Sequence, residues 1–394
     1  MTKVKLKEAT KELNQKAGEI LEESARIRRS AEHRFLSAVL ALMICVSLFA
    51  GLAAPKAEAA GSASYVDFVE FGMYAWNSRG IGIAALRTDG TVALWDPDAV
   101  LSGKELSRVR AWKNVVQLMD AGEALLALRA DGTVDAAIYD EKNAPFDRSA
   151  VNEWRNIRML VCYNAYHCYA VGWDGKLYYT GGELFTDMEP YDFSRWTNLK
   201  KLVAGVCPKS EYMLGLCWDG TVIDNRVLDS QMEGFDLPWS GETKNIVDIA
   251  SNGWLDLALR ADGTVLLRGT DRRVYEKTIR QWKNVASVCF VQDYAVGLLK
   301  DGTVVCVDSD LQKAVSGWRN VRTLLPLPGY YALIAVLADG SVKTAYLGEY
   351  DPFSSSDLEN WTNIKRICAG DGIIYGEQAD GHFLTVGFDL KNLK

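Results

Sequence analysis

The sequence predicts an all-β protein whose main part is a β-propeller of eight tandem repeats, each about 41 residues long, preceded by an N-terminal helix and an apolar segment. Two observations support this prediction. Asp-Gly pairs flanked by apolar segments recur at intervals of 38 to 45 residues, and seven of the eight are preceded, 17 to 21 residues upstream, by an Asn that opens the unit. Strand-rich units of this period cannot bury both faces alone, so they pack side by side, and a propeller is the closed form. Eight blades are the direct interpretation, and seven blades plus a divergent first unit are the alternative.

Residues 1–34 are predicted to form a charged helical extension. Leu6, Leu13, Ile20 and Ile27 repeat every seven residues, with Lys and Glu between them. Such a heptad pattern is typical of a helix that self-associates. The alternative is a solvated, mildly amphipathic helix.

Residues 35–59 are predicted to be a signal peptide or a signal-anchor helix. The segment FLSAVLALMICVSLFAGLAA, residues 35–54, has no charge, follows the basic stretch RIRRSAEHR, and precedes the small-x-small site Ala57-Glu58-Ala59. These are the parts of a secretory signal peptide. The length and the basic flank also fit a membrane-spanning helix with a cytoplasmic N-terminus. Residues 60–394 are therefore expected outside the cytoplasmic membrane, either secreted after cleavage near Ala59 or anchored through residues 35–54.

Residues 60–394 are predicted to be the repeat domain. The Asp of each Asp-Gly pair is Asp89, Asp131, Asp174, Asp219, Asp262, Asp301, Asp339 or Asp380. Asp-Gly between apolar strands is a strong hairpin signal, and we expect a type I′ turn with positive φ at both central residues. The variable stretch after the third strand, such as DPDAVLSGKELSRVRA at residues 96–111, is expected to supply a fourth strand and a long loop.

Two further positions recur in the repeats. The opening Asn is Asn114, Asn156, Asn198, Asn245, Asn284, Asn320 or Asn363, and all but Asn245 have Trp two residues earlier. The residue four before each Asp is always small: Ala85, Ala127, Ala170, Gly215, Ala258, Gly297, Ala335 or Gly376. Because strand side chains alternate faces, we expect bulky apolar groups of a neighbour to pack on this small face, and Trp to pack between blades.

Charge and cysteine content exclude some classes of function. Residues 1–34 carry nine Lys/Arg and six Asp/Glu, whereas residues 60–394 carry 34 basic and 44 acidic residues. A domain this acidic is not expected to bind nucleic acid through its phosphates. The eight cysteines include no CxxC pair and are read mainly as small buried hydrophobes. Cys162 with Cys168, or Cys207 with Cys217, could bridge neighbouring strands in an oxidising compartment.

The segments from Trp112 to Val134 and from Trp282 to Val304 resemble the repeat of the regulator of chromosome condensation family, in its bacterial exported form. The common pattern is W-x-N-[VI]-x-x-[IL] followed by L-x-x-D-G-T-V, and the resemblance covers roughly residues 65–389. It implies a β-propeller, usually of seven blades in that family, that can serve as a protein-binding surface. The family often has Gly-His at the start of the second strand, and His167 alone stands in that place here.

Catalytic and metal-binding patterns are not found. Each Asp-Gly turn supplies one carboxylate without the alternating ligands of a calcium loop, so these residues are read as structural. There is no G-x-S-x-G, no metal-ligand spacing around His, no phosphate loop and no sialidase Asp-box. We therefore predict a non-enzymatic protein without a cofactor or metal.

Aromatic residues in the loops between first and second strands are the candidate binding residues, since these loops emerge at one end of a propeller. They are Tyr74, Trp76, Tyr163, Tyr166, Trp254, Tyr294, Tyr330 and Tyr331. Exposed Tyr and Trp are typical of protein-binding hot spots and also stack on sugar rings. The prediction is an exported protein-protein interaction module. The alternatives are a carbohydrate-binding module for cell-surface glycans, a propeller hydrolase or lyase, and aromatics that are simply packed at the strand entrance.

Overall fold

The computed structural model describes residues 65–72, 81–139, 148–162, 167–181, 193, 196–207, 210–224, 244–269, 273–327, 331–347, 355–370, 373–387, 389 and 392–393. These residues belong to one compact unit, Ser62–Lys394. The predicted helix at 1–34 and the apolar segment at 35–59 lie outside them.

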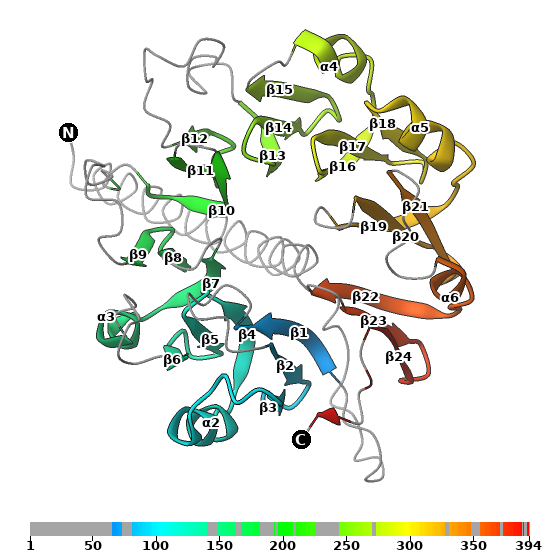
Figure 1. The fold of residues 1–394 in the computed structure, drawn as a ribbon. Coiled ribbons are helices and arrows are strands. Elements are labelled where there is room, and N and C mark those ends of the chain that lie inside the picture. Colours follow the sequence, from blue (N-terminus) through cyan, green and yellow to red (C-terminus); the bar gives the residue numbers. More distant parts are fainter. Residues whose placement is uncertain are drawn as a thin grey trace, which may run out of the picture. The chain divides into compact units, whose positions relative to one another are not determined.

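The described residues form eight antiparallel sheets, and each sheet contains three strands in chain order (Figure 1). Each sheet is one blade, so the first unit forms a complete blade and the eight-bladed prediction is confirmed. Blades 1 to 4 are β1 (Tyr65–Phe71), β2 (Gly82–Arg87), β3 (Val92–Trp95); β4 (Val115–Asp120), β5 (Ala124–Arg129), β6 (Val134–Ile138); β7 (Ile157–Cys162), β8 (His167–Gly172), β9 (Leu177–Gly181); and β10 (Leu199–Cys207), β11 (Ser210–Cys217), β12 (Val222–Asp224). Blades 5 to 8 are β13 (Ile246–Ser251), β14 (Leu255–Arg260), β15 (Val265–Gly269); β16 (Val285–Val291), β17 (Tyr294–Leu299), β18 (Val304–Cys306); β19 (Val321–Leu327), β20 (Ala332–Leu337), β21 (Val342–Tyr346); and β22 (Ile364–Gly370), β23 (Ile373–Gln378), β24 (Phe383–Val386).

The blades close into a ring through their first strands. Each first strand contacts the first strand of the next blade, and β22 of blade 8 contacts β1 of blade 1. Apolar cores lie between every two neighbouring blades. In the core between blades 8 and 1, aromatic rings pack against one another: the ring centroids of Phe68 and Tyr375 lie 4.5 Å apart, and Tyr375 stacks on Phe383 at 5.3 Å. Closure therefore gives blades 8 and 1 a shared apolar core.

The Asp-Gly turns are three-residue hairpins, not the type I′ turns that the sequence predicted. In blade 6, the Leu299 N–H donates to the Thr303 carbonyl at 2.8 Å, and the Gly302 N–H donates to the Leu299 carbonyl at 2.9 Å. Gly302 has φ 78°, whereas Asp301 is not among the described non-glycine residues with positive φ. This is a type I turn followed by a left-handed glycine. This turn needs positive φ only at the Gly, because its loop has three residues and the third accommodates the twist of the two strands.

The Asp side chain closes this turn from inside. Asp301 Oδ1 accepts the Thr303 N–H at 2.9 Å and the Thr303 hydroxyl at 2.6 Å. These hydrogen bonds, first from the hydroxyl and then from the backbone, hold the pKa of Asp301 below its usual value. The other Asp-Gly-Thr turns repeat this geometry. The carboxylates are therefore used within their own turns, in line with their structural interpretation.

Each opening Asn joins its blade to the turn of the preceding blade. All seven have φ between 55° and 63°, a left-handed conformation that Asn tolerates better than most residues. In blade 6, Val285 donates its N–H to the carbonyl of Gly263 in the turn of blade 5 at 3.0 Å. The Asn284 carbonyl accepts the N–H of Lys300 at 2.8 Å. A Cβ added to Gly263 would lie 2.9 Å from the Asn284 Cα, so a side chain here would force the backbone to shift.

The small position of the second strand faces bulky apolar groups, as the sequence predicted. A Cβ on Gly376 would lie 2.6 Å from Cζ3 of Trp361, the Trp that opens the same unit. In blade 2, Ala127 and Trp112 share one core with Leu86 and Leu94 of blade 1. The Trp therefore packs between blades and lies on the small face of its own blade.

A fourth strand in residues 96–111 was predicted wrongly, because helix α2 (Gly103–Arg110) forms there. Other connections contain α3 (Arg148–Glu153), α4 (Arg273–Ile279), α5 (Ser309–Val315) and α6 (Ser355–Glu359). α2 contacts β3 and β6, the third strands of blades 1 and 2, and buries Val109 between them. Ser102 caps the helix by accepting the N–H of Glu105 at 3.4 Å. The motif Ser102-x-x-Glu105 is a capping-box sequence, so a signal for this helix was present.

Candidate functional site

The loops between the first and second strands of blades 5, 6 and 7 form one hydrogen-bonded surface, called here the 5–7 loop face. Its described residues are 252–254, 292–293 and 331. Asn252 Nδ2 donates to the Gln292 carbonyl at 3.1 Å and to Asp293 Oδ1 at 3.4 Å. Gln292 Nε2 donates to the Tyr331 hydroxyl at 3.4 Å. The loops of blades 5, 6 and 7 are thus joined to one another by side-chain hydrogen bonds.

Trp254 projects from a loop that the Asn252 side chain holds in place. Asn252 Oδ1 accepts the N–H of Trp254 at 3.1 Å and of Leu255 at 2.8 Å. Gly269 lies against this loop so closely that an added Cβ would be 2.0 Å from the Trp254 carbonyl oxygen. The Trp254 side chain is nevertheless 40% exposed. A large apolar ring is therefore held at the surface by an ordered loop.

Tyr331 is the second exposed aromatic residue of this face, at 46% exposure. It has φ 53°, and Gln292 has φ 52°. Non-glycine residues in the left-handed region cost roughly 1–2 kcal/mol each, and they persist where surrounding contacts hold them. Here those contacts include the Gln292–Tyr331 hydrogen bond and the Leu347 N–H, which donates to the Tyr331 carbonyl at 2.8 Å. Strained backbone of this kind gathers at functional sites.

Tyr294 does not belong to the exposed set. It is half-buried, and its ring packs edge-on against Tyr275 of α4 with centroids 6.4 Å apart. This agrees with the alternative interpretation, in which an aromatic residue packs at the strand entrance. The remaining predicted residues, Tyr74, Trp76, Tyr163, Tyr166 and Tyr330, lie outside the described residues.

Three residues of the 5–7 loop face, Asn252, Gln292 and Asp293, were not among the predicted binding residues. Asn252 is followed by Gly253, and Asn-Gly is a turn signal that marks where such a side chain can be presented. Gln292 had no comparable signal, because its positive φ and its contact with Tyr331 depend on the next blade.

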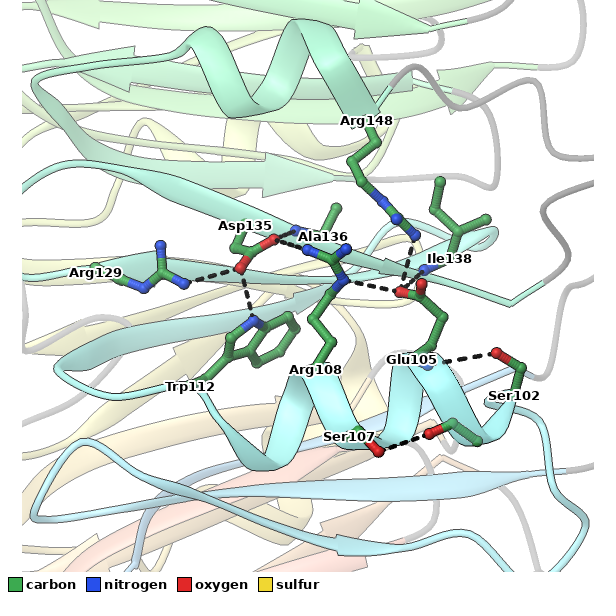
Figure 2. Close-up of polar contacts among 11 residues, drawn as sticks. Ser102, Glu105, Ser107, Arg108, Trp112, Arg129, Asp135, Ala136, Ile138 and Arg148 are labelled. Atoms are coloured by element: carbon green, nitrogen blue, oxygen red, sulfur yellow. Dashed lines mark hydrogen bonds and ion pairs between the residues drawn. The ribbon is translucent and has the colours of Figure 1, made fainter.

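A second polar cluster lies around α2 and links this helix to strand β6 and helix α3 (Figure 2). Fully buried Glu105 pairs with Arg148 at 2.8 Å and Arg108 at 3.3 Å, and it accepts the N–H of Ile138 at 3.3 Å. Asp135 of β6 pairs with Arg129 at 2.8 Å.

This cluster also reaches the opening Trp of blade 2. Asp135 Oδ2 accepts the indole N–H of Trp112 at 3.0 Å and Oδ1 pairs with Arg108 at 3.3 Å. The ion pairs and hydrogen bonds of this cluster thus link α2, Trp112 and the start of α3 to strand β6. The buried Glu105 carboxylate is neutralised by two arginines through Oε2, although its Oε1 has no hydrogen-bond partner among the described residues, and we assign the cluster a structural role.

Neither a metal centre nor a membrane helix is found within the part of the chain that the structure describes. In those residues, no three or more His, Cys, Asp or Glu side chains gather in a way that could hold a metal ion. The helices among them are too short or too polar to cross a membrane. The apolar segment at 35–54 lies outside the described residues.

Comparison with known proteins gives matches among solved structures only. No family model matches this chain, and no curated protein does. The computationally designed Ika8 protein is similar with a TM-score of 0.43 and 15% identity, over 78% of this chain and 93% of that chain. The ectodomain of the Arabidopsis thaliana receptor kinase ACR4 is similar with a TM-score of 0.40 and 13% identity, over 83% and 96%. Prp20p from Saccharomyces cerevisiae, a protein described with its binding to Gsp1p and histones, has a TM-score of 0.39 and 14% identity over 83% and 82%.

Proposed function

We propose that residues 60–394 form a non-catalytic module that binds another protein through the 5–7 loop face. The observation that carries this proposal is that Trp254 and Tyr331, at 40% and 46% exposure, lie on loops joined by hydrogen bonds. Trp and Tyr are enriched among the residues that dominate protein–protein binding. Loops ordered before binding lose less entropy when the partner docks, which favours affinity.

The test compares three proteins with the wild type in capture experiments from the extracytoplasmic fraction. They are the single variant Trp254→Ala, the double variant Trp254→Ala/Tyr331→Ala, and the control Trp173→Ala. Trp173 is 44% exposed but belongs to the turn between second and third strands, at the other end of its blade. We expect wild type and control to enrich the same protein, and the double variant to bind it at least about 30-fold more weakly, since a hot-spot residue contributes about 2 kcal/mol or more.

Two results would contradict the proposal. One is equal capture of the partner by wild type and by the double variant. The other is that wild type enriches no protein above background. A glycan array with the same variants addresses the carbohydrate-binding alternative, because an exposed Trp also stacks on sugar rings. Sugar binding that is lost in Trp254→Ala, without any protein partner, would favour that alternative.

We further propose that this module acts outside the cytoplasmic membrane. The basis is the basic stretch at 26–34, the uncharged segment at 35–54 and the small-x-small site before Ala60. N-terminal sequencing of the exported protein tests it. A start at Ala60 means a secreted protein, and an intact Met1 means a membrane-anchored one. Recovery of the whole protein from the cytoplasm alone would refute the proposal.

A further inference from the structure

Two cysteines of blade 3 lie within reach of a covalent bond. Cys162 ends β7, and the register of the hairpin places it directly opposite Cys168 of β8. Their sulfur atoms are 2.9 Å apart, and the Cys162 thiol donates to the Cys168 sulfur. That separation is within about 1 Å of the length of a disulfide bond. Both cysteines are free thiols in this structure.

The register excludes the second bridge that the sequence left open. On β10 and β11, Cys207 lies opposite Ser210, whereas Cys217 lies opposite Leu199 at the other end of the hairpin. These two cysteines are therefore separated by most of a strand length, more than about 20 Å, and cannot bond in this fold.

Two cysteines of blade 6 are also too far apart. Cys289 and Cys306 both pair with Val296, from its two sides. Two strand spacings, about 10 Å, lie between them. Disulfides need Cα atoms within about 7 Å, so the geometry favours the blade 3 pair.

We propose that Cys162 and Cys168 form an intramolecular disulfide by exchange with a low-molecular-weight disulfide donor such as oxidised glutathione. The Cys162 sulfur attacks one sulfur of the donor, the donor S–S bond breaks, and one donor thiol leaves with the Cys162 proton. The Cys168 sulfur then attacks the Cys162 sulfur of the mixed disulfide and releases the second donor thiol, which takes the Cys168 proton. The two cysteines are oxidised by two electrons, and the donor is reduced to two thiols.

Exposure sets the order of these steps. Cys168 is fully buried, whereas Cys162 is partly buried, so the donor reaches Cys162 first. The groups that face Cys162 are Cys168 itself, the Asp120 carboxylate, Tyr139, whose hydroxyl donates to Asp120 at 2.6 Å, and Glu123 near that hydroxyl. Burial, Cys168 and Asp120 raise the pKa of the Cys162 thiol above its ordinary value. Because the thiolate is the attacking form, oxidation should accelerate by about tenfold per pH unit near neutral pH.

The bond joins strand ends that are already paired, so blade 3 keeps its fold in both redox states. The disulfide would close the short connection between β7 and β8, which carries Tyr163 and Tyr166 in the sequence. The inference does not depend on the 5–7 loop face, which belongs to other blades.

The experiment uses the purified full chain in glutathione buffers of rising oxidised fraction, followed by thiol alkylation, proteolysis and mass spectrometry. We expect a linked peptide pair containing Cys162 and Cys168 and the loss of two alkylated thiols. Cys168→Ser should accumulate a glutathione adduct on Cys162, and Cys162→Ser should give neither product. The control Cys306→Ser, at a buried cysteine of another blade, should form the Cys162–Cys168 link at the wild-type rate.

Two outcomes would overturn the proposal. In the first, the folded chain keeps both thiols at donor concentrations that oxidise the same chain in urea. In the second, wild type accumulates the Cys162 adduct without resolving it, which would mean that Cys168 cannot reach it. Urea-unfolded protein is measured beside each variant, so that a folding defect is recognised by its urea-like oxidation pattern.

Discussion

Gly263 and Gly381 form a matched pair that tests how strongly neighbouring blades depend on the Asn–turn contact. Both follow the Asp of an Asp-Gly turn, with φ 81° and 85°. They differ in what a new side chain would meet. A Cβ on Gly263 would lie 2.9 Å from the Asn284 Cα and 3.0 Å from the Val285 N, whereas a Cβ on Gly381 would meet no described atom within 4 Å. The first unit has no Trp-x-Asn start, and among the described residues no Asn packs on the turn of blade 8.

The expected costs follow from this difference. In both variants, Gly→Ala places a Cβ in the left-handed region, which costs roughly 1–2 kcal/mol. At Gly263 the new methyl group also collides with backbone atoms, which cannot rotate away, and overpacking of this kind costs about 1–3 kcal/mol more. Gly263→Ala is therefore expected to lower the free energy of unfolding by about 2–5 kcal/mol, and Gly381→Ala by about 1–2 kcal/mol.

Urea unfolding of the full chain, followed by tryptophan fluorescence, measures both variants against wild type. The midpoint should fall clearly further for Gly263→Ala, with the slope unchanged if the same surface is exposed on unfolding. Equal midpoints for the two variants would refute the reasoning, because they would show that the blade-to-blade contact adds nothing to the cost of the backbone conformation.

Two further predictions concern the closure between blades 8 and 1. Arg366 is 7% exposed, donates to the carbonyls of Tyr65 and Val66, and pairs with Glu377 at 2.9 Å. Arg366→Met should lower the free energy of unfolding by about 3 kcal/mol or more, because it leaves the Glu377 charge without this partner. Arg322→Met removes a similar but exposed link between blades 7 and 8, so it should shift the urea midpoint much less. Equal shifts would show that the link between blades 8 and 1 contributes no more to stability than the link between blades 7 and 8. Burial raises the pKa of Asp67 to about 7, against the lowering effects of the Phe68 N–H and the Arg366 cation. Because the folded protein then binds this proton more tightly than the unfolded chain, the stability from Asp67 is complete below about pH 4 and is lost as the pH rises through about 7. Urea midpoints of wild type should therefore fall between pH 5 and pH 8 by more than those of Asp67→Asn, and parallel pH profiles would contradict this assignment.

The candidate site was only partly predictable. The loop residues that carry Trp254 and Tyr331 were identified because their position relative to the strands repeats along the chain. Whether an aromatic ring is exposed depends on the neighbouring element: Tyr294 packs on Tyr275 of α4, and no local pattern indicates that contact. The link from Asn252 through Gln292 to Tyr331 joins residues about 40 positions apart, so it exists only once three blades stand side by side.

The sequence by itself determined the architecture. Eight Asp-Gly turns and eight small residues recur once per blade, and an opening Asn recurs in seven of the eight, because these are local requirements of backbone and packing. This pattern predicted a propeller but left seven or eight blades open, and the complete first sheet, β1-β2-β3, decided for eight. The tertiary structure decided the rest. The turn has one left-handed residue because a type I turn followed by Gly satisfies the strand twist, and residues 103–110 form a helix because that helix covers the seam between two third strands. The pairing of Cys162 with Cys168, and the exclusion of Cys207 with Cys217, depend on strand register, which is set by contacts between strands and not by spacing along the chain.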